Sequence, residues 1–436
     1  MIPSISLFVL SVSWAYGVYA YGGVEVGSWR WCVVGVCAAA LIQWLFPQRR
    51  GEGESRQLDV MILALVLFLG VLQLIPVPFS LLHLFSPHRF RQLAIASQAV
   101  GPIKTGSLSS VPAATRDSVL TLAVYVVGFL LVCDLRRRMS DRHWILAVPV
   151  VMIAFLEAVL GLFQFYGGGD GAVGTYVNRN HFAGLLEMGL PLALMLGIFA
   201  LSQNRDRFQS RVLPTVVACV LFGSAAVMLV SVINSQSRMG FVSALVSLFI
   251  CGVVGLSSHY SAGASQWRRW LPVVAVTVMI GLGFVFLPSD QLIGRFATIA
   301  TTQEPSEDTR KELWKETIPL IEAYPITGCG LGAYESCFLP YKIVAPGYTT
   351  DFAHNDYLQL AAEFGLPGFV LVLTLAVLVY GSALRRTNVD NPGRYLAIAC
   401  VGSLSAILLH SLVDFNLYIP ANGMLAVWIG ALARES

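Results

Sequence analysis

One polar interval, residues 288–365, interrupts a chain that is otherwise almost continuously apolar. It contains Pro305-Ser-Glu-Asp-Thr-Arg310-Lys-Glu-Leu-Trp314 and, further on, Asp351-Phe-Ala-His354-Asn-Asp-Tyr-Leu358. A single long polar segment between apolar runs indicates an extramembrane loop that a membrane-embedded scaffold holds at the bilayer surface. Within this loop, Arg310 and His354 are the side chains at which we expect chemistry.

The composition of the whole chain agrees with a membrane scaffold. Of its 436 residues, 56% are hydrophobic and only 12% are charged, and the mean hydropathy is +0.70. Soluble domains carry about 25% charged residues, so a soluble fold of this length could not bury so much apolar surface. The net charge is only +3 and the arginines are scattered in short clusters, which argues against nucleic acid as a partner.

Apolar runs of about 20 residues, the length that crosses a bilayer as a helix, recur along the chain. We count twelve, and therefore expect an all-α fold: a polytopic membrane protein with about twelve transmembrane helices and one large outer loop that contains short helices. The expected division is helices one to nine in residues 1–287, a catalytic loop in 288–365 and helices ten to twelve in 366–436. The runs lie near 4–22, 29–46, 58–75, 116–134, 144–166, 181–201, 212–233, 239–256, 270–287, 366–384, 395–413 and 420–433.

Positive charge in the loops predicts the orientation of these helices. Short basic loops favour the cytoplasmic side, and here one set of alternate loops is short and basic. The 288–365 loop also carries basic residues, but the rule does not apply to long loops. Both termini are then cytoplasmic and the 288–365 loop lies outside. We therefore expect a multi-pass protein of the bacterial inner membrane with its active site on the periplasmic side. The basic loops hold Arg49, Arg50 and Arg56; Arg136, Arg137, Arg138 and Arg142; Arg205, Arg207 and Arg211; Arg268 and Arg269; and Arg385, Arg386 and Arg394.

Three arginines, Arg179, Arg238 and Arg310, are expected at the outer side. A guanidinium presents a planar fork of donors that matches phosphate oxygens, and it stays charged in a low-dielectric site. Several together suit an anionic headgroup such as a lipid diphosphate. Each one alone is explained equally well as an anchor to ordinary phospholipid. The other ionisable residues expected on this side are His181, His354 and Asp414, with His410 about one turn deeper.

The segment around Arg310 predicts a helix. Thr309 and Glu312 fit a capping box at its start, so Arg310 would lie in the first turn. We expect Arg310 to point away from the apolar face of this helix; the alternative is a solvated basic patch. The apolar face would consist of Leu313, Trp314, Ile318 and Ile321.

A second helix is expected to begin at Asp351, as its N-cap, and to end at Gly365. His354 would lie in its first turn, where the positive end of the helix dipole favours a neutral imidazole, and a neutral imidazole can act as a general base. A lone histidine is more often structural. His354 stands next to Asn355 on a polar loop that faces an apolar bundle, and this favours a functional role.

Several motifs are absent from the sequence. No Asp-x-Asp or dense carboxylate cluster lies on the outer side, which disfavours metal-assisted glycosyl transfer, so we expect no metal and no cofactor. No Gly-x-Ser-x-Gly or Walker A motif occurs, and Gly328-Cys-Gly-Leu-Gly332 indicates a turn. Cys329 and Cys337 in the outer loop either form a disulfide or stay free.

Short motifs follow one another in a defined order between about residues 170 and 420. They are Asn178-x-Asn180-x-Phe182, Ser237-Arg238 after a tight turn, Arg310 followed by Trp314, Pro325-x-x-Gly328-x-Gly330-x-Gly332, His354-Asn355-x-x-Leu358 with Gly365-x-x-Gly368, and His410-Ser-Leu-Val-Asp414. In this order and spacing they resemble the O-antigen ligase and polymerase superfamily.

The resemblance implies an inverting, metal-independent glycosyltransferase that moves a glycan from undecaprenyl diphosphate to an acceptor hydroxyl. The acceptor is the lipid A–core in ligases, another lipid-linked repeat unit in polymerases, and protein Ser or Thr in a related branch. We expect ligation to lipid A–core, a step of lipopolysaccharide biosynthesis, with polymerisation of O-antigen or exopolysaccharide as the alternative. The implied partners are the lipid-linked donor, the acceptor glycan and membrane lipid. The resemblance implies that Arg238 and Arg310 hold the diphosphate and that His354 activates the acceptor, while Arg179, His181, Asn355 and Asp414 would bind substrate.

A transporter of polysaccharide or lipid is the second alternative. It would also be polytopic and would also bind an anionic headgroup, but it should show charged or broken helices near the bilayer midplane and two related halves. Glu157 and Glu187 are candidate buried charges for this function. The polar residues gather at one surface and no two-half symmetry is visible, so the sequence favours the transferase.

Overall fold

The protein is an α-helical bundle, seen here in a computed structural model that describes residues 2–46, 54–202, 212–260, 307–343, 350–389 and 391–434. Within these residues, nine helices are long and apolar enough to cross a membrane, by length and composition. Eleven of the twelve expected runs correspond to helices, and the twelfth, 270–287, lies outside the described residues. The helices are α1 (Ile2–Tyr19), α2 (Val26–Trp44), α3 (Glu54–Leu72), α6 (Pro112–Arg138), α7 (Val148–Tyr166), α8 (Arg179–Ser202), α9 (Val212–Asn234), α10 (Arg238–Tyr260), α15 (Asp356–Thr387), α16 (Gly393–His410) and the shorter α17 (Pro420–Ala433).

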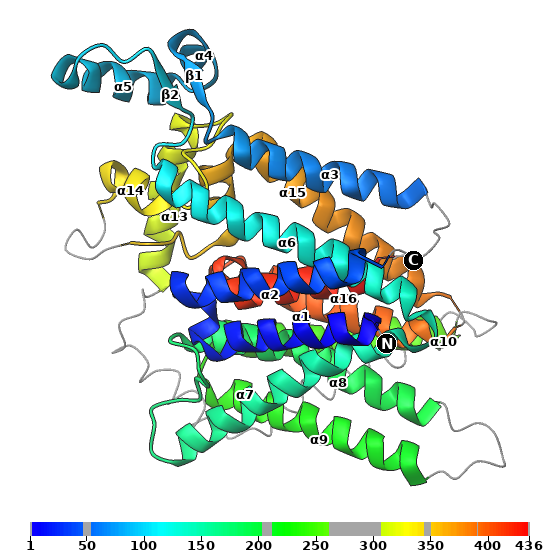
Figure 1. The fold of residues 1–436 in the computed structure, drawn as a ribbon. Helices are drawn as coiled ribbons and strands as arrows, with labels where there is room; N and C mark the ends of the chain where they lie inside the picture. The colour runs from blue at the N-terminus through cyan, green and yellow to red at the C-terminus, as the bar shows by residue number, and fades with distance from the viewer. Residues whose placement is uncertain are drawn as a thin grey trace.

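The expected all-α polytopic fold is confirmed. The described residues contain only two short strands, β1 (Pro76–Pro78) and β2 (Thr105–Ser107), which pair antiparallel with Val77 opposite Gly106. Between them lie α4 (Phe79–Phe85) and α5 (Pro87–Val100), which project from the bundle beside α3 (Figure 1). This appendage lies at the same end of the bundle as α13 (Glu307–Ala323) and α14 (Tyr334–Phe338), whereas both chain termini lie at the other end (Figure 1).

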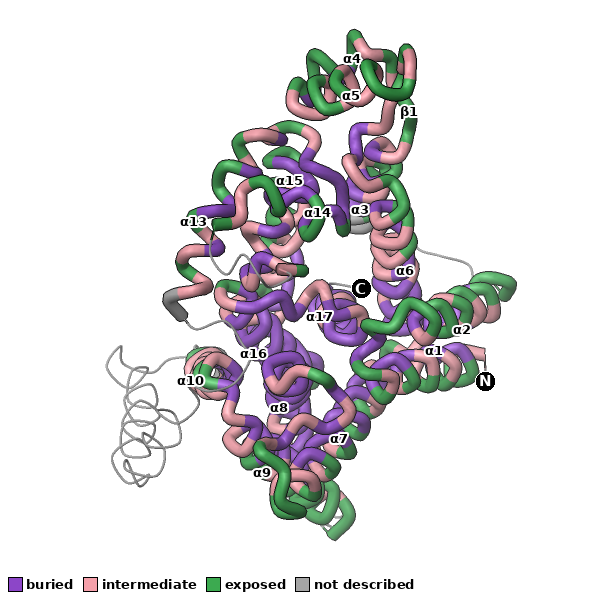
Figure 2. The backbone as a smooth tube through the Cα atoms, turned by 90° about the vertical axis from the view of Figure 1, so that its left-hand side faces the viewer, coloured by how far each residue is buried: buried purple, intermediate pink, exposed green. Residues whose placement is uncertain are grey.

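Helix α8 lies in the core of the bundle. It is buried almost all round from Asn180 to Gly197, and it packs against α7, α9, α10 and α16. Small residues allow this close approach, since a Cβ on Gly189 would come within 2.8 Å of the Cβ of Ala154. Figure 2 shows α8, α16 and α17 as the buried centre, with the exposed faces of α1, α2 and α9 around it. Exposed apolar residues such as Phe8, Trp31 and Val220 lie on these outer helices, as expected where lipid is the solvent.

Helix α15 is broken near its start by Gly365, which has a φ of 71°. A Cβ on Gly365 would come within 2.8 Å of the backbone nitrogen of Gly328, and a Cβ on Gly328, whose φ is 68°, would overlap the carbonyl oxygen of Glu363. The glycine-rich turn and the kink of α15 therefore pack backbone against backbone. Cys329 donates its backbone N–H to Ala362 (2.9 Å), which fixes the turn to the helix.

Helix α13 differs from the sequence-based expectation in two respects. It begins at Glu307, so Thr309 is inside the helix and the expected capping box is wrong. Ile318, which was expected on the apolar face, is 44% exposed. The buried positions of α13 are Leu313, Thr317 and Leu320, which follow one another at intervals of three or four residues. Arg310 lies three residues before Leu313 and seven before Thr317, so it shares the buried face. The expectation that Arg310 points away from the packed face was wrong, because the neighbouring polar turn supplies acceptors for a buried guanidinium.

Candidate active site

The turn between α16 and α17, residues 411–414, is held in place by the polar loop. Asn355 donates its side-chain amide to the carbonyl of Leu412 (2.8 Å), and Arg310 donates Nη1 to the carbonyl of Val413 (2.9 Å). The backbone N–H of Asp356 donates to the carbonyls of Ser411 (3.0 Å) and Asp414 (3.2 Å). These contacts bring the start of α15 and the start of α13 onto one turn at the end of the bundle that also carries α14.

Asp414 is the point at which three predicted site residues meet. Its Oδ1 lies 3.7 Å from His181 Nε2 and 3.7 Å from His354 Nδ1, and its Oδ2 lies 3.8 Å from Arg310 Nη2. The side chain of Asp414 is fully buried, and those of His181, His354 and Arg310 are 7%, 14% and 14% exposed. The separations are those of ion pairs and exceed direct hydrogen-bonding distance.

The charge of Asp414 is stabilised by this arrangement. Burial alone would raise the pKa of Asp414, but His181, His354 and the Arg310 guanidinium outweigh it and hold that pKa well below the ordinary value. Within the described part of the chain, His181 Nε2, His354 Nδ1 and Asp414 Oδ2 are buried and make no hydrogen bond. Buried polar atoms are normally hydrogen-bonded, so unsatisfied atoms that face one another indicate a site that a substrate or water completes.

Phe415 positions the two histidines. Its ring packs edge-to-face against His181 (4.6 Å between centroids) and His354 (4.9 Å), and it stacks on Phe352 (4.1 Å). The backbone N–H of Phe415 also donates to Asp414 Oδ1 (2.8 Å), so one residue orients both imidazoles and the carboxylate.

His354 lies just before α15 and not in its first turn. The N-cap of α15 is Asn355, whose Oδ1 accepts from the backbone N–H groups of Tyr357 (3.0 Å) and Leu358 (3.1 Å), so the expected cap at Asp351 is wrong. His354 has a φ of 49°, a left-handed conformation that costs energy in a residue with a side chain. Its carbonyl and that of Ala353 accept from Trp314 Nε1 (3.4 and 3.1 Å), which helps to hold this strained backbone.

The remaining predicted residues lie around this centre with different roles. Both polar ends of the Asn355 side chain are engaged in the helix cap and the turn, so we assign Asn355 to positioning rather than to substrate contact. Arg179 is the first residue of α8 and Arg238 the first residue of α10. A Cβ on Gly240 would overlap that of Ala183, so the starts of α10 and α8 pack together and place both arginines at the same end of the bundle.

The sequence missed one interaction directly behind the site. His410 Nδ1 lies 3.1 Å from both carboxylate oxygens of Glu187, and both side chains are completely buried. His410 is the last residue of α16 and Glu187 lies within α8, so the pair joins two core helices one turn below Asp414. Two ionisable residues inside apolar runs were the available signal, but their spacing in the sequence gives no indication that they are partners.

The described residues contain neither a disulfide nor a metal centre. Cys329 and Cys337 are both free thiols, so of the two alternatives for this pair the structure has the unbridged one. Among the residues described, no group of three or more His, Cys, Asp or Glu side chains is arranged to hold a metal ion.

Fold and site together define a polytopic membrane protein with a buried cluster of histidine, arginine and carboxylate side chains at one end of its bundle. Residues 223–373, from within α9 to within α15, match a family described as O-antigen ligase. The match includes Arg238, Arg310, His354 and Asn355, whereas His181 and Asp414 lie outside it. No match is found among curated proteins. The family supports a membrane glycan ligase or polymerase type of function, with a glycosyltransferase-like activity.

Proposed function

We propose that the protein is an inverting, metal-independent glycosyltransferase that moves a glycan from undecaprenyl diphosphate to an acceptor hydroxyl. The preferred reaction is ligation of O-antigen to lipid A–core in lipopolysaccharide biosynthesis, at the periplasmic side of the bacterial inner membrane. Polymerisation, in which the acceptor is another lipid-linked repeat unit, uses the same chemistry and is the alternative outcome of the test below.

The convergence of Arg310, His181 and His354 on buried Asp414 carries this proposal. With Nδ1 facing the carboxylate, His354 keeps Nε2 for the proton of an acceptor hydroxyl, and Asp414 stabilises the imidazolium that forms. Because Asp414 is fully buried beneath these side chains, it is badly placed to attack the sugar itself. A single displacement by the acceptor, which inverts the anomeric centre, therefore suits the geometry better than a double displacement through an enzyme carboxylate.

Arginines supply the stabilisation that the leaving group needs. Cleavage of the glycosyl bond moves negative charge onto the lipid diphosphate, and guanidinium groups fixed before the reaction stabilise that charge without reorganising. Arg310 is fixed by Val413 and Asp414, and we assign Arg238 and Arg179 to the same diphosphate from their positions at the starts of α10 and α8.

The transporter alternative would need the intramembrane charges to form a pathway. The buried carboxylates of Glu157 and Glu187 are observations in its favour. Glu157 accepts from the backbone N–H and the hydroxyl of Thr175, and Glu187 binds His410 and joins α8 to α16. These contacts explain both carboxylates as part of the scaffold. We therefore keep the transferase as the proposal.

The test is transfer of a lipid-linked, labelled glycan by the purified protein in membranes, with lipid A–core or lipid-linked repeat units as acceptor. We expect His354→Ala to lower turnover by about 10²–10⁴-fold, the usual contribution of a general base, while the donor still binds. His143→Ala is the matched control, because His143 precedes α7 at the opposite end of the bundle. A folded His354→Ala protein that transfers at the wild-type rate would remove His354 from the mechanism.

A further inference from the structure

Two cysteine thiols lie together in the polar segment outside the bundle. Cys329 belongs to the glycine-rich turn and Cys337 to α14, and both are part of one buried cluster around Tyr324. Two backbone hydrogen bonds fold the chain between them: the N–H of Ala333 donates to the carbonyl of Gly330 (3.0 Å), and the N–H of Cys337 donates to the carbonyl of Ala333 (3.0 Å). The thiol of Cys329 donates a hydrogen bond to the sulfur of Cys337. The two sulfur atoms therefore face each other, which a disulfide requires.

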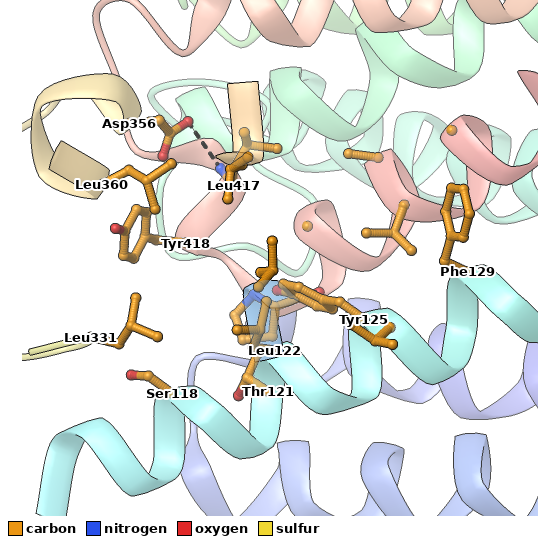
Figure 3. Close-up of a pocket in the computed structure, with 18 of the residues that line it drawn as sticks. Ser118, Thr121, Leu122, Tyr125, Phe129, Leu331, Asp356, Leu360, Leu417 and Tyr418 are labelled. Atoms are coloured by element: carbon orange, nitrogen blue, oxygen red, sulfur yellow. Dashed lines mark hydrogen bonds between the residues drawn. The ribbon is translucent and has the colours of Figure 1, made fainter. Parts of the chain in front are cut away.

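The backbone of Cys329 is fixed on both sides. Its N–H donates to the carbonyl of Ala362 in α15 (2.9 Å), and its carbonyl accepts from the backbone N–H of Ser110, just before α6 (2.9 Å). Leu331, two residues further on, packs against α6 in a shared apolar cluster, and Figure 3 shows its side chain beside Ser118 of this helix. Helix α14 is only five residues long. The turn therefore holds Cys329 in place, and a short helix presents Cys337 to it.

The two thiols are not equivalent. Cys337 is 8% exposed, whereas Cys329 has no exposed surface. The hydrogen bond from Cys329 lowers the pKa of Cys337 below its ordinary value against the effect of burial, and Ser110 and the positive charge of Arg89 act in the same direction. The same hydrogen bond, together with burial, raises the pKa of Cys329. Because the thiolate is the reactive form of cysteine, Cys337 is the nucleophile of the pair and Cys329 keeps its proton.

We propose that Cys337 and Cys329 form a redox-active dithiol, in which Cys337 attacks an incoming disulfide and Cys329 resolves the product. In the first step the Cys337 thiolate forms a bond with one sulfur of the oxidant, and the other sulfur leaves as a thiolate. In the second step the proton of Cys329 passes to that thiolate, and the Cys329 sulfur displaces the rest of the oxidant from Cys337. The protein gains one internal disulfide, and the oxidant is reduced to two thiols.

The new bond would join α14 to the turn that is packed on the kink of α15. The polar segment is expected outside the membrane, in a compartment where disulfides form and persist. The facing sulfur atoms and the fixed backbone of Cys329 carry the inference, which does not depend on the proposed transfer reaction.

The experiment uses the full-length protein, purified with reductant and transferred to lipid nanodiscs, and dithiodipyridine as a small disulfide oxidant. Mass spectrometry should find Cys329 and Cys337 bridged, with no pyridyl group retained on either. The internal control is a second buried pair, Cys251 in α10 and Cys400 in α16, which are 2% and 0% exposed and should keep their thiols. Separate pyridyl adducts on Cys329 and Cys337, or two unmodified thiols, would overturn the proposal.

Two serine substitutions separate the roles of the thiols, because serine is similar in size and can still donate a hydrogen bond. Cys329→Ser should retain one pyridyl group on Cys337, since no second thiol displaces it. In Cys337→Ser, the buried Cys329 should react at least about tenfold more slowly than Cys337 does in Cys329→Ser. Equal rates at the two positions would overturn the assignment of Cys337 as the attacking thiol. If a serine variant does not fold, bridging in the wild-type protein decides the proposal by itself.

Discussion

A buried carboxylate that faces two imidazoles and a guanidinium stays ionised over a wide range of pH. Burial would raise the pKa of Asp414, but its three partners hold that pKa well below the ordinary value of about 3.9. Ionised Asp414 therefore contributes stability that is fully present above about pH 3.9 and is lost as the pH falls through the lower folded-state pKa. At neutral pH the carboxylate is available to orient His181 and His354 and to pair with Arg310.

This reasoning predicts how Asp414→Asn should behave. The difference in unfolding temperature between wild type and Asp414→Asn should stay constant from pH 7 to about pH 5 and should shrink below about pH 4. Thermal unfolding of both proteins at a series of pH values measures it. A difference that already shrinks between pH 7 and pH 5 would show that Asp414 titrates there.

Arg310 should not be replaceable by lysine. Its fork reaches both the Val413 carbonyl and Asp414, and a single ammonium cannot occupy both positions while it binds a phosphate oxygen. We expect Arg310→Lys to lower the transfer rate by about 10²–10³-fold, as for the loss of one preorganised donor to a developing anion. Lys315→Arg, on the exposed side of the same helix, is the control and should be silent. A near-normal transfer rate in Arg310→Lys would show that Arg310 contributes only its positive charge and not the geometry of its guanidinium.

At the scale of elements, the kink of α15 and the glycine turn before α14 form one unit. Gly328 has a φ of 68° and packs directly on the carbonyl of Glu363, so Gly328→Ala adds both backbone strain of about 1–3 kcal/mol and a steric overlap. We expect a lower unfolding temperature and a loss of activity, because Asn355 caps α15 and His354 directly precedes this cap. Gly223→Ala is the matched control: Gly223 lies within α9 with no atom near its Cβ position, so alanine should slightly stabilise the helix. If Gly328→Ala leaves the unfolding temperature and the activity unchanged, the turn is not tightly packed.

The elements also show where sequence reasoning succeeded and where it failed. Apolar runs and the glycine and proline breaks predicted most helices, because the length and hydrophobicity of a span are local properties. The face of α13 and the start of α15 were predicted wrongly, because tertiary partners decided them: Arg310 turns inward to meet the 411–414 turn, and Asn355 caps α15 because its other end binds Leu412. The central place of Asp414 could not be predicted either, since its partners are far from it in the sequence: His181 by 233 residues, Arg310 by 104 and His354 by 60.

For the whole molecule, the basic side chains of the candidate site gather at one end of the bundle. Arg179 begins α8, Arg238 begins α10, and Arg310 approaches from α13 to pair with Asp414. On the proposed function, this is the end at which the anionic headgroup of the donor would bind, next to the histidines that face Asp414.

The orientation of the bundle in the cell is the last prediction. The structure places α13 and α14 at the end opposite both termini (Figure 1). Arg310 of α13 pairs with Asp414, so the histidine cluster lies at that end too. The basic loops, including Arg136–Arg142, alternate with these outer segments. Short basic loops stay cytoplasmic, so the histidine cluster should face the periplasm, where lipid-linked glycans and their acceptors would meet.

Ser336→Cys and Ser140→Cys test this orientation, because both positions are exposed serines. Ser336 lies in α14, and Ser140 lies beside the basic loop after α6. In a background with the native cysteines replaced, a membrane-impermeant maleimide should label position 336 in cells with a permeabilised outer membrane. Position 140 should react only after the inner membrane is opened. If position 140 is labelled and position 336 is protected, the orientation is the reverse of the predicted one. The site would then face the cytoplasm, where transfer to a periplasmic acceptor is impossible.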